Sequence, residues 1–109
     1  VAANQRHLHC DVSVQRHGWG EPVEWAPELV VGSDVTYDRD AHDRLCTTLK
    51  ALKAPALLAH QHRRVASLLS GESQLDHFLA ATASVGLAVD RLHEDGTNPL
   101  APVSILRVK

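Results

Sequence analysis

Two short apolar runs separated by one amphipathic stretch constrain the fold of this chain more than any other feature. The first run spans residues 29–33 and the second spans residues 56–60. A continuous apolar run of this length is typical of a strand that is covered on both faces, as in a parallel sheet. Between the two runs, apolar side chains recur at helical spacing, at Ala41, Leu45, Leu49 and Leu52. The strand–helix–strand order predicts a parallel pair joined by a right-handed crossover.

The rest of the chain extends this pattern in both directions. Residues 12–15 are short and β-branched, which indicates an earlier strand. Asp38 or Asp40 is placed to cap the central helix, and Pro55 ends it. A second helical region follows residue 64, with an interruption at Gly71. Its second part carries an apolar stripe and stops at Gly86; the stripe is Leu75, Phe78, Leu79 and Thr82.

Two further stretches close the predicted sheet. Residues 87–92 and 103–108 both have the composition of strands. No helix fits between them, so we expect an antiparallel pair. The fold class is therefore α/β, with parallel strands, helices and a C-terminal antiparallel pair.

Composition and charge exclude several function classes. The net charge of −2 and the apolar fraction of 44% are ordinary for a globular protein, and no basic face points to nucleic acid as a partner. No apolar run approaches the roughly 18 residues that a membrane span needs. The N-terminus carries no secretory signal pattern. We expect a cytoplasmic protein, with the nucleus as the alternative, that contacts neither membrane nor nucleic acid.

Cysteine and histidine spacing argues against a disulfide frame and against a metal centre. Cys10 and Cys46 are far apart and form no CxxC pair. Four of the eight histidines occur in two close pairs, His7 with His9 and His60 with His62. Residues i and i+2 share one face of a strand and can chelate a metal, but no third and fourth ligand follows at a standard spacing. We expect no metal.

Polar and aromatic groups follow each predicted strand. They are Trp19–Glu21, then Ser33–Asp38, then Gln61–Arg64. In open α/β sheets, ligands bind beyond the carboxyl ends of parallel strands. We therefore expect these three groups to converge in one crevice.

The same residues carry a family resemblance over nearly the whole chain. Trp19-Gly20-Glu21, followed by Leu29 to Asp34 running into Val35-Thr36-Tyr37, resembles the seven-β-strand, methyltransferase-like family of protein-lysine methyltransferases. Thr47, Leu49 and Leu52 fit the helix that follows in this family. The resemblance implies a Rossmann-like, class I methyltransferase fold that uses S-adenosyl-L-methionine and acts on a protein lysine.

The resemblance also implies roles for single residues. Trp19 would border the adenine of the cofactor, and Ser33 and Tyr37 would contact it near its methionine portion. Asp34 would face the substrate amine, as an orienting group rather than a proven base. Gln61 and Arg63 would take part in substrate binding.

The family's glycine-rich cofactor loop and the acidic residue that binds the ribose hydroxyls do not occur in the 109 residues. Gly18-Trp19-Gly20 is no substitute, because it opens no helix. We therefore expect residues 1–109 to form one partial domain, the C-terminal half of the fold. This fragment would be inactive alone and would act within a longer, monomeric enzyme.

Two alternatives stay open. The chain can be a truncated or degenerate methyltransferase-like module that binds a partner protein without catalysis, in which case it would not bind S-adenosylmethionine. It can also be another α/β module such as a receiver domain, because Asp34 follows a strand. A receiver needs an acidic cluster before that aspartate, and none is present.

Overall fold

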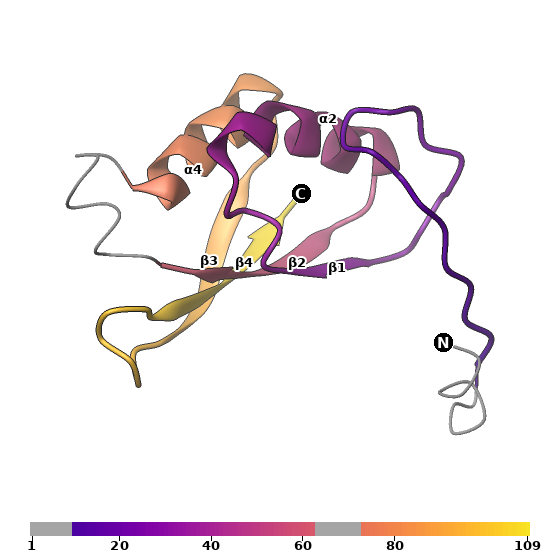
Figure 1. The fold of residues 1–109 in the computed structure, drawn as a ribbon. Helices are drawn as coiled ribbons and strands as arrows, with labels where there is room; N and C mark the ends of the chain where they lie inside the picture. The colour runs from indigo at the N-terminus through magenta and orange to yellow at the C-terminus, as the bar shows by residue number, and fades with distance from the viewer. Residues whose placement is uncertain (1–9, 63–72) are drawn as a thin grey trace.

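The described part of the chain forms a mixed sheet with two α-helices on one of its faces (Figure 1). The structure is a computed structural model and describes residues 10–62 and 73–109. The sheet has four strands in the order β1-β2-β4-β3. The elements, in chain order, are β1 (Val30–Ser33), the 3-10 helix η1 (Arg39–Ala41), α2 (His42–Leu52), β2 (Ala56–Gln61), α4 (Gln74–Ser84), β3 (Val89–Asp95) and β4 (Val103–Val108).

The central strand–helix–strand unit is confirmed. β1 and β2 pair in parallel, with Val30 opposite Ala56, and α2 connects them. Asp38 caps the helical entry: its Oδ1 accepts a hydrogen bond from the Asp40 backbone N–H at 3.1 Å. The exit follows Leu52, where Lys53 adopts the left-handed conformation before Pro55 prevents further helix.

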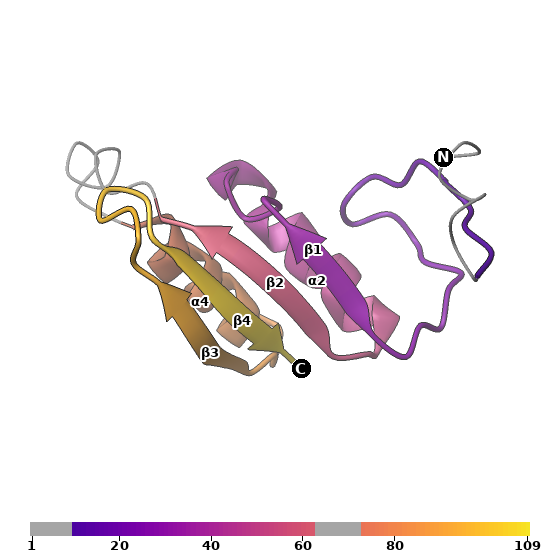
Figure 2. The same cartoon turned by 90° about the horizontal axis from the view of Figure 1, so that it is seen from below.

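The second helix and the closing pair are confirmed as well. Ser73 caps α4, and Gly86 follows its end with a φ of 78°. The expected helical segment between residue 64 and Gly71 lies outside the described residues. β3 and β4 are antiparallel, and β4 also pairs antiparallel with β2, so it lies between β2 and β3 (Figure 2).

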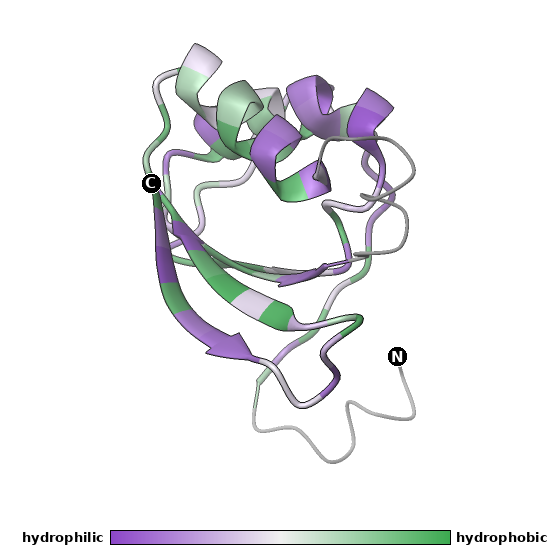
Figure 3. Ribbon diagram, turned by 90° about the vertical axis from the view of Figure 1, so that its left-hand side faces the viewer, coloured by the Kyte–Doolittle hydropathy of each residue, from purple (hydrophilic) through white to green (hydrophobic). Residues whose placement is uncertain are grey.

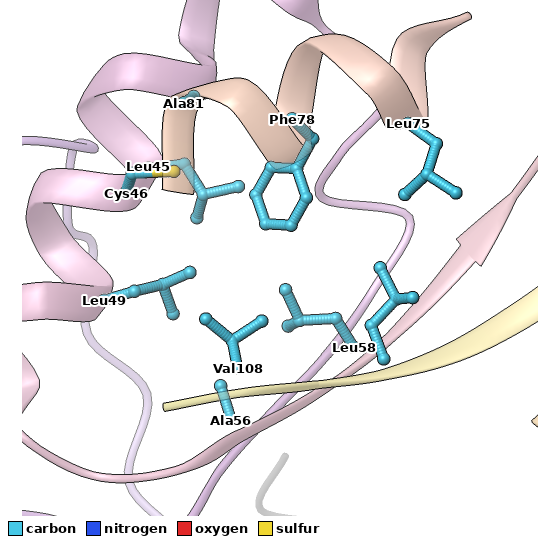
Figure 4. Close-up of a cluster of buried hydrophobic side chains, with 10 residues drawn as sticks. Leu45, Cys46, Leu49, Ala56, Leu58, Leu75, Phe78, Ala81 and Val108 are labelled. Carbon is cyan, nitrogen blue, oxygen red and sulfur yellow. The ribbon is translucent and has the colours of Figure 1, made fainter. Parts of the chain in front are cut away.

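The core lies between the two helices and the sheet (Figure 4). Each helix contributes one apolar stripe, and β2 and β4 contribute alternate residues. The buried cluster consists of Leu45, Cys46, Leu49, Ala56, Leu58, Leu75, Phe78, Ala81, Leu106 and Val108. The leucine, valine and phenylalanine side chains among them each stabilise the fold by about 1.5–3 kcal/mol through burial, so this layer holds α2 and the strand ends beside it in place.

One predicted strand is wrong. Residues 12–15 belong to an extended segment without strand pairing, which reaches β1 at Val30. Within the described part of the chain, β1 pairs only with β2 and its other edge carries no strand. An extended, β-branched stretch becomes a strand only where a neighbour supplies the ladder of hydrogen bonds.

The expectation that residues 29–33 are covered on both faces is also wrong. Val31 is 74% exposed, because α2 and α4 both lie on the opposite face of the sheet (Figure 1). Figure 3 shows β4 largely hydrophobic and the outer strand β3 mostly hydrophilic, as suits an edge strand. Among residues 10–62 and 73–109, neither helix has the length and apolar character to cross a bilayer.

Candidate functional site

The backbone turns sharply where β1 ends, at Asp34. This residue has a φ of 58°, in the left-handed region that side-chain-bearing residues rarely occupy. The turn is held to the next strand, because the Asp34 N–H donates to the Ala59 carbonyl at 3.3 Å. Left-handed geometry costs a non-glycine residue on the order of 1–2 kcal/mol. Residues in strained conformations are common at functional sites, where the surrounding structure imposes the conformation.

A hollow of about 400 Å³ opens on one side of Asp34. It is lined by Trp19, Asp34, Val35, Tyr37, Asp38, Ala41 and Arg44. Two aromatic rings and two carboxylates thus share one concave surface with a guanidinium group. Trp19 is 41% exposed and Tyr37 is 56% exposed, so both rings are accessible to a ligand. We refer to these seven residues as the aromatic hollow.

Trp19 reaches the aromatic hollow from a loop and not from a strand tip. The Gly20 N–H donates to the Thr48 hydroxyl of α2 at 2.8 Å, and the Glu21 N–H donates to the Gly18 carbonyl at 3.1 Å. Gly20 has a φ of 86° and lies against the Arg44 side chain, where a Cβ would come within 3.4 Å. The positive φ is the reason that glycine suits this position.

A second hollow of about 290 Å³ opens on the other side of Asp34. It is lined by Ser33, Asp34, Ala59, Gln61 and Val103, at the ends of β1, β2 and β4. We refer to it as the strand-end hollow. Asp34 is common to both hollows, so a group bound in one lies beside a group bound in the other.

The structure therefore divides the residues that the sequence predicted to meet. Trp19, Asp34 and Tyr37 line the aromatic hollow, whereas Ser33 and Gln61 line the strand-end hollow with Asp34. The single predicted crevice is two adjoining hollows. Arg63 lies outside the described residues.

Arg44 of the aromatic hollow was not singled out from the sequence. Asp38 was expected as a helix cap and as part of the Ser33–Asp38 group at the crevice, but without a role of its own in the site. A signal for Arg44 exists in the helical period, because Arg44 follows Ala41 by three residues and so lies on the same face of the helix. No pattern in the sequence indicates that the loop around Trp19 packs against that face of the helix.

Buried polar groups support the loop from beneath. Thr36 is 1% exposed, and its hydroxyl lies 2.5 Å from the Nδ1 of His60. Its carbonyl oxygen lies 2.7 Å from the Nε2 of His42. Burial lowers the pKa of His42 below its ordinary value of 6.5. His42 therefore stays neutral in the fold near pH 7.

Neither a reactive thiol nor a metal cluster is found beside the hollows. Cys46 is buried, and burial, with a smaller contribution from Asp43, raises the pKa of its thiol to about 11. It is therefore a core residue and not a nucleophile. In the described ranges, no group of three or more histidine, cysteine, aspartate or glutamate residues is arranged to hold a metal ion.

Comparison with known proteins assigns the family. The model of the lysine methyltransferase family matches residues 1–93. The chain belongs to this family. The match covers β1, α2, β2, α4 and most of β3, and the mixed sheet corresponds to part of the class I methyltransferase fold. No curated protein matched the chain. In this member of the lysine methyltransferase family, the two hollows that share Asp34 are the candidate functional site.

Proposed function

We propose that this chain takes part in S-adenosyl-L-methionine-dependent methyl transfer to a lysine side chain of a protein substrate. Family membership supports methyl transfer in general. The observation that supports this particular reaction is the strained turn at Asp34 between two hollows. A transfer reaction needs a donor and an acceptor held next to each other, and a residue shared by two adjoining hollows suits that need.

The chemistry of the aromatic hollow suits a cation. The methyl donor is a sulfonium and the resting acceptor is an ammonium, so both carry positive charge. One well-placed aromatic face favours a cation by about 0.5–2 kcal/mol, and Trp19 and Tyr37 both line this hollow. The carboxylates of Asp34 and Asp38 add attraction of the same sign. The Arg44 guanidinium opposes it and instead suits a carboxylate, such as that of the cofactor's methionine portion.

The residue roles in this proposal are those that the family resemblance implies. S-adenosylmethionine supplies an electrophilic methyl group when bound. Trp19, Tyr37 and Ser33 would contact this cofactor, while Gln61 and Arg63 would contact the substrate. Asp34 would hold the lysine nitrogen in line with the methyl carbon. The nitrogen lone pair forms the new N–C bond as the S–C bond breaks, and the product ammonium then loses its extra proton to solvent.

Asp34 orients the amine rather than deprotonating it in this proposal. A lysine must lose a proton before it attacks, starting from a pKa near ~10.4. An adjacent anion stabilises the ammonium and so opposes this loss. The gain must therefore come from alignment, which is the largest contribution available to an in-line displacement. The glycine-rich cofactor loop does not occur in the 109 residues. In this proposal, other residues of a longer enzyme supply it.

The experiment is methyl transfer by the intact enzyme carrying Asp34→Ala. We expect at least a hundredfold lower transfer of labelled methyl groups to lysine in a substrate protein mixture, with S-adenosylmethionine binding changed far less. Asp43→Asn is the matched control, because it removes an exposed carboxylate of α2 that lines neither hollow. Unchanged turnover in Asp34→Ala would remove this residue from the site.

A non-catalytic role in binding a partner protein is the second candidate. The uncovered face of the sheet, with Val31 74% exposed, favours it. Calorimetric titration of the intact wild-type protein with S-adenosylmethionine separates the two candidates. Binding is expected for the enzyme, and no binding at millimolar ligand would favour the partner-binding module.

A further inference from the structure

Two buried histidines form hydrogen bonds with the loop of the candidate site, residues 34–37, from opposite sides. Within this loop, Asp34 and Tyr37 face the aromatic hollow, whereas Thr36 points inward and is 1% exposed. Buried hydroxyl and carbonyl groups require hydrogen-bond partners. Both polar groups of Thr36 find theirs in histidine rings.

The two rings come from opposite layers of the fold. His42, at the start of α2, is 0% exposed, and its Nε2 lies 2.7 Å from the Thr36 carbonyl oxygen. His60, on β2, is 2% exposed, and its Nδ1 lies 2.5 Å from the Thr36 hydroxyl. The loop is thereby tied to the helical layer and to the sheet through a single residue.

The hydrogen-bond pattern determines the tautomer of the neutral His42 ring. A carbonyl oxygen only accepts, so His42 Nε2 must carry a hydrogen and donate to Thr36. In the neutral ring Nδ1 then accepts, and its partner at 2.7 Å is the Nδ1 of His77 on α4, which donates. The His42 ring is thereby held by a hydrogen bond on each of its two nitrogens.

The groups packed around His42 also act on its charge. The Phe78 ring of α4 packs edge-on against it, with ring centroids 5.4 Å apart. Before α2, the negative charge of Asp38 raises the pKa of His42 and the positive charge of Arg39 lowers it. Burial outweighs both, and His77 acts in the same direction as burial. The neutral ring is the form that the fold selects.

We propose that His42 and His60 are positioning residues, which fix the Asp34–Tyr37 loop through Thr36 in the conformation that methyl transfer needs. Asp34 keeps a φ of 58° only while its surroundings impose it. Two hydrogen bonds at Thr36, two residues further along, provide that constraint. The catalytic consequence rests on the proposed function, whereas the structural link between the histidines and the loop does not.

The first test compares His42→Phe with His42→Gln in the intact enzyme. Phenylalanine fills the ring space without a donor, whereas the glutamine amide keeps an N–H near the position of Nε2. We expect kcat to fall about ten- to a hundredfold in His42→Phe, KM for S-adenosylmethionine to stay within about twofold, and His42→Gln to recover most of the loss. His93→Phe, at an exposed histidine of β3, is the matched control.

A second test measures the conformation of the loop directly and does not depend on enzymatic activity. In amide NMR spectra, the Asp34 and Tyr37 signals should move in His42→Phe, which lacks the donor to the Thr36 carbonyl, and should stay near their wild-type positions in His42→Gln. The same signals should move in Thr36→Val, which removes the hydroxyl and preserves the shape, while the amide of Val108, at the far end of β4, remains in place.

The outcomes separate this proposal from the proposed function. If the Asp34 and Tyr37 amides respond neither to His42→Phe nor to Thr36→Val, the positioning role is wrong whatever the activity. Equal losses of activity in His42→Phe and His42→Gln would also overturn it, because they would mean that the donor is irrelevant. If the amides respond but Asp34→Ala keeps full activity, the loop is positioned as inferred and the proposed function fails.

Discussion

At the scale of single residues, Asp34 combines a conformational cost with a functional position. Its left-handed φ is the geometry that glycine adopts without penalty. The chain has an aspartate there, with a carboxylate exposed to both hollows. A residue that weakens the fold in this way indicates that the side chain serves function, since stability alone would favour glycine.

We therefore predict that substitutions at position 34 affect stability and activity differently. We expect Asp34→Gly to exceed Asp34→Ala in unfolding free energy by about 1 kcal/mol, because alanine retains the left-handed penalty and glycine does not. Both variants should be equally inactive, since both lack the carboxylate. Urea denaturation gives the first comparison and methyl transfer gives the second. Equal stability of the two variants would mean that the turn relaxes and stores no strain.

At the scale of elements, the N-termini of the two helices are capped in different ways. α2 follows the 3-10 helix η1, which Asp38 caps. Ala41 at the end of η1 and Arg44 in the first turn of α2 both line the aromatic hollow. α4 depends on Ser73, whose hydroxyl accepts a hydrogen bond from the Asp76 N–H at 3.0 Å. A capping side chain satisfies one of the N–H groups that a helix start leaves without a partner.

Replacing this cap tests how strongly α4 depends on it. We expect Ser73→Ala to lower the unfolding free energy by about 0.5–2 kcal/mol, and Ser73→Asp to lower it far less, because aspartate caps as well as serine does. Thermal or urea unfolding followed by circular dichroism measures both. A loss of equal size in Ser73→Asp would show that the hydroxyl acts by some means other than capping.

At the scale of the whole molecule, the fold is one-sided. Both helices pack on the same face of the sheet, and the core lies entirely in that layer (Figure 4). The buried His42 belongs to this layer too, so its protonation affects the stability of the whole. In the unfolded chain its pKa lies near the ordinary 6.5, and in the fold burial lowers it.

The sign of the pH effect follows from that difference. Between the two pKa values the unfolded state binds more protons, so stability rises with pH and falls as pH drops below about 6.5. One such proton limits the slope to about 1.4 kcal/mol per pH unit. The lowered pKa values of Asp90, which its hydrogen bond with Arg107 stabilises, and of Asp95 matter only at lower pH, near and below their ordinary 3.8.

We therefore expect urea denaturation to give a lower unfolding free energy at pH 5.5 than at pH 7.5. In His42→Phe the difference should shrink, whereas His93→Phe should retain it. A difference of unchanged size in His42→Phe would assign the effect to other groups.

The sequence by itself determined the local elements and the family. Periodic apolar residues, Asp38, Pro55 and Gly86 act within a few positions of themselves, so α2, α4, β2 and the closing pair could be predicted from them. Neighbouring motifs around Trp19 and Asp34 likewise indicated a lysine methyltransferase, which the family match confirms. These signals are readable because their physical causes are local in the chain.

Only the tertiary structure decided what depends on partners distant in sequence. Residues 12–15 have the composition of a strand and form none, because pairing needs a neighbour that composition cannot specify. The Trp19 loop is attached to α2 by the Gly20–Thr48 hydrogen bond, and Thr36 is held by histidines 6 and 24 positions away. Such contacts form only when the chain folds back on itself, and no local pattern encodes them.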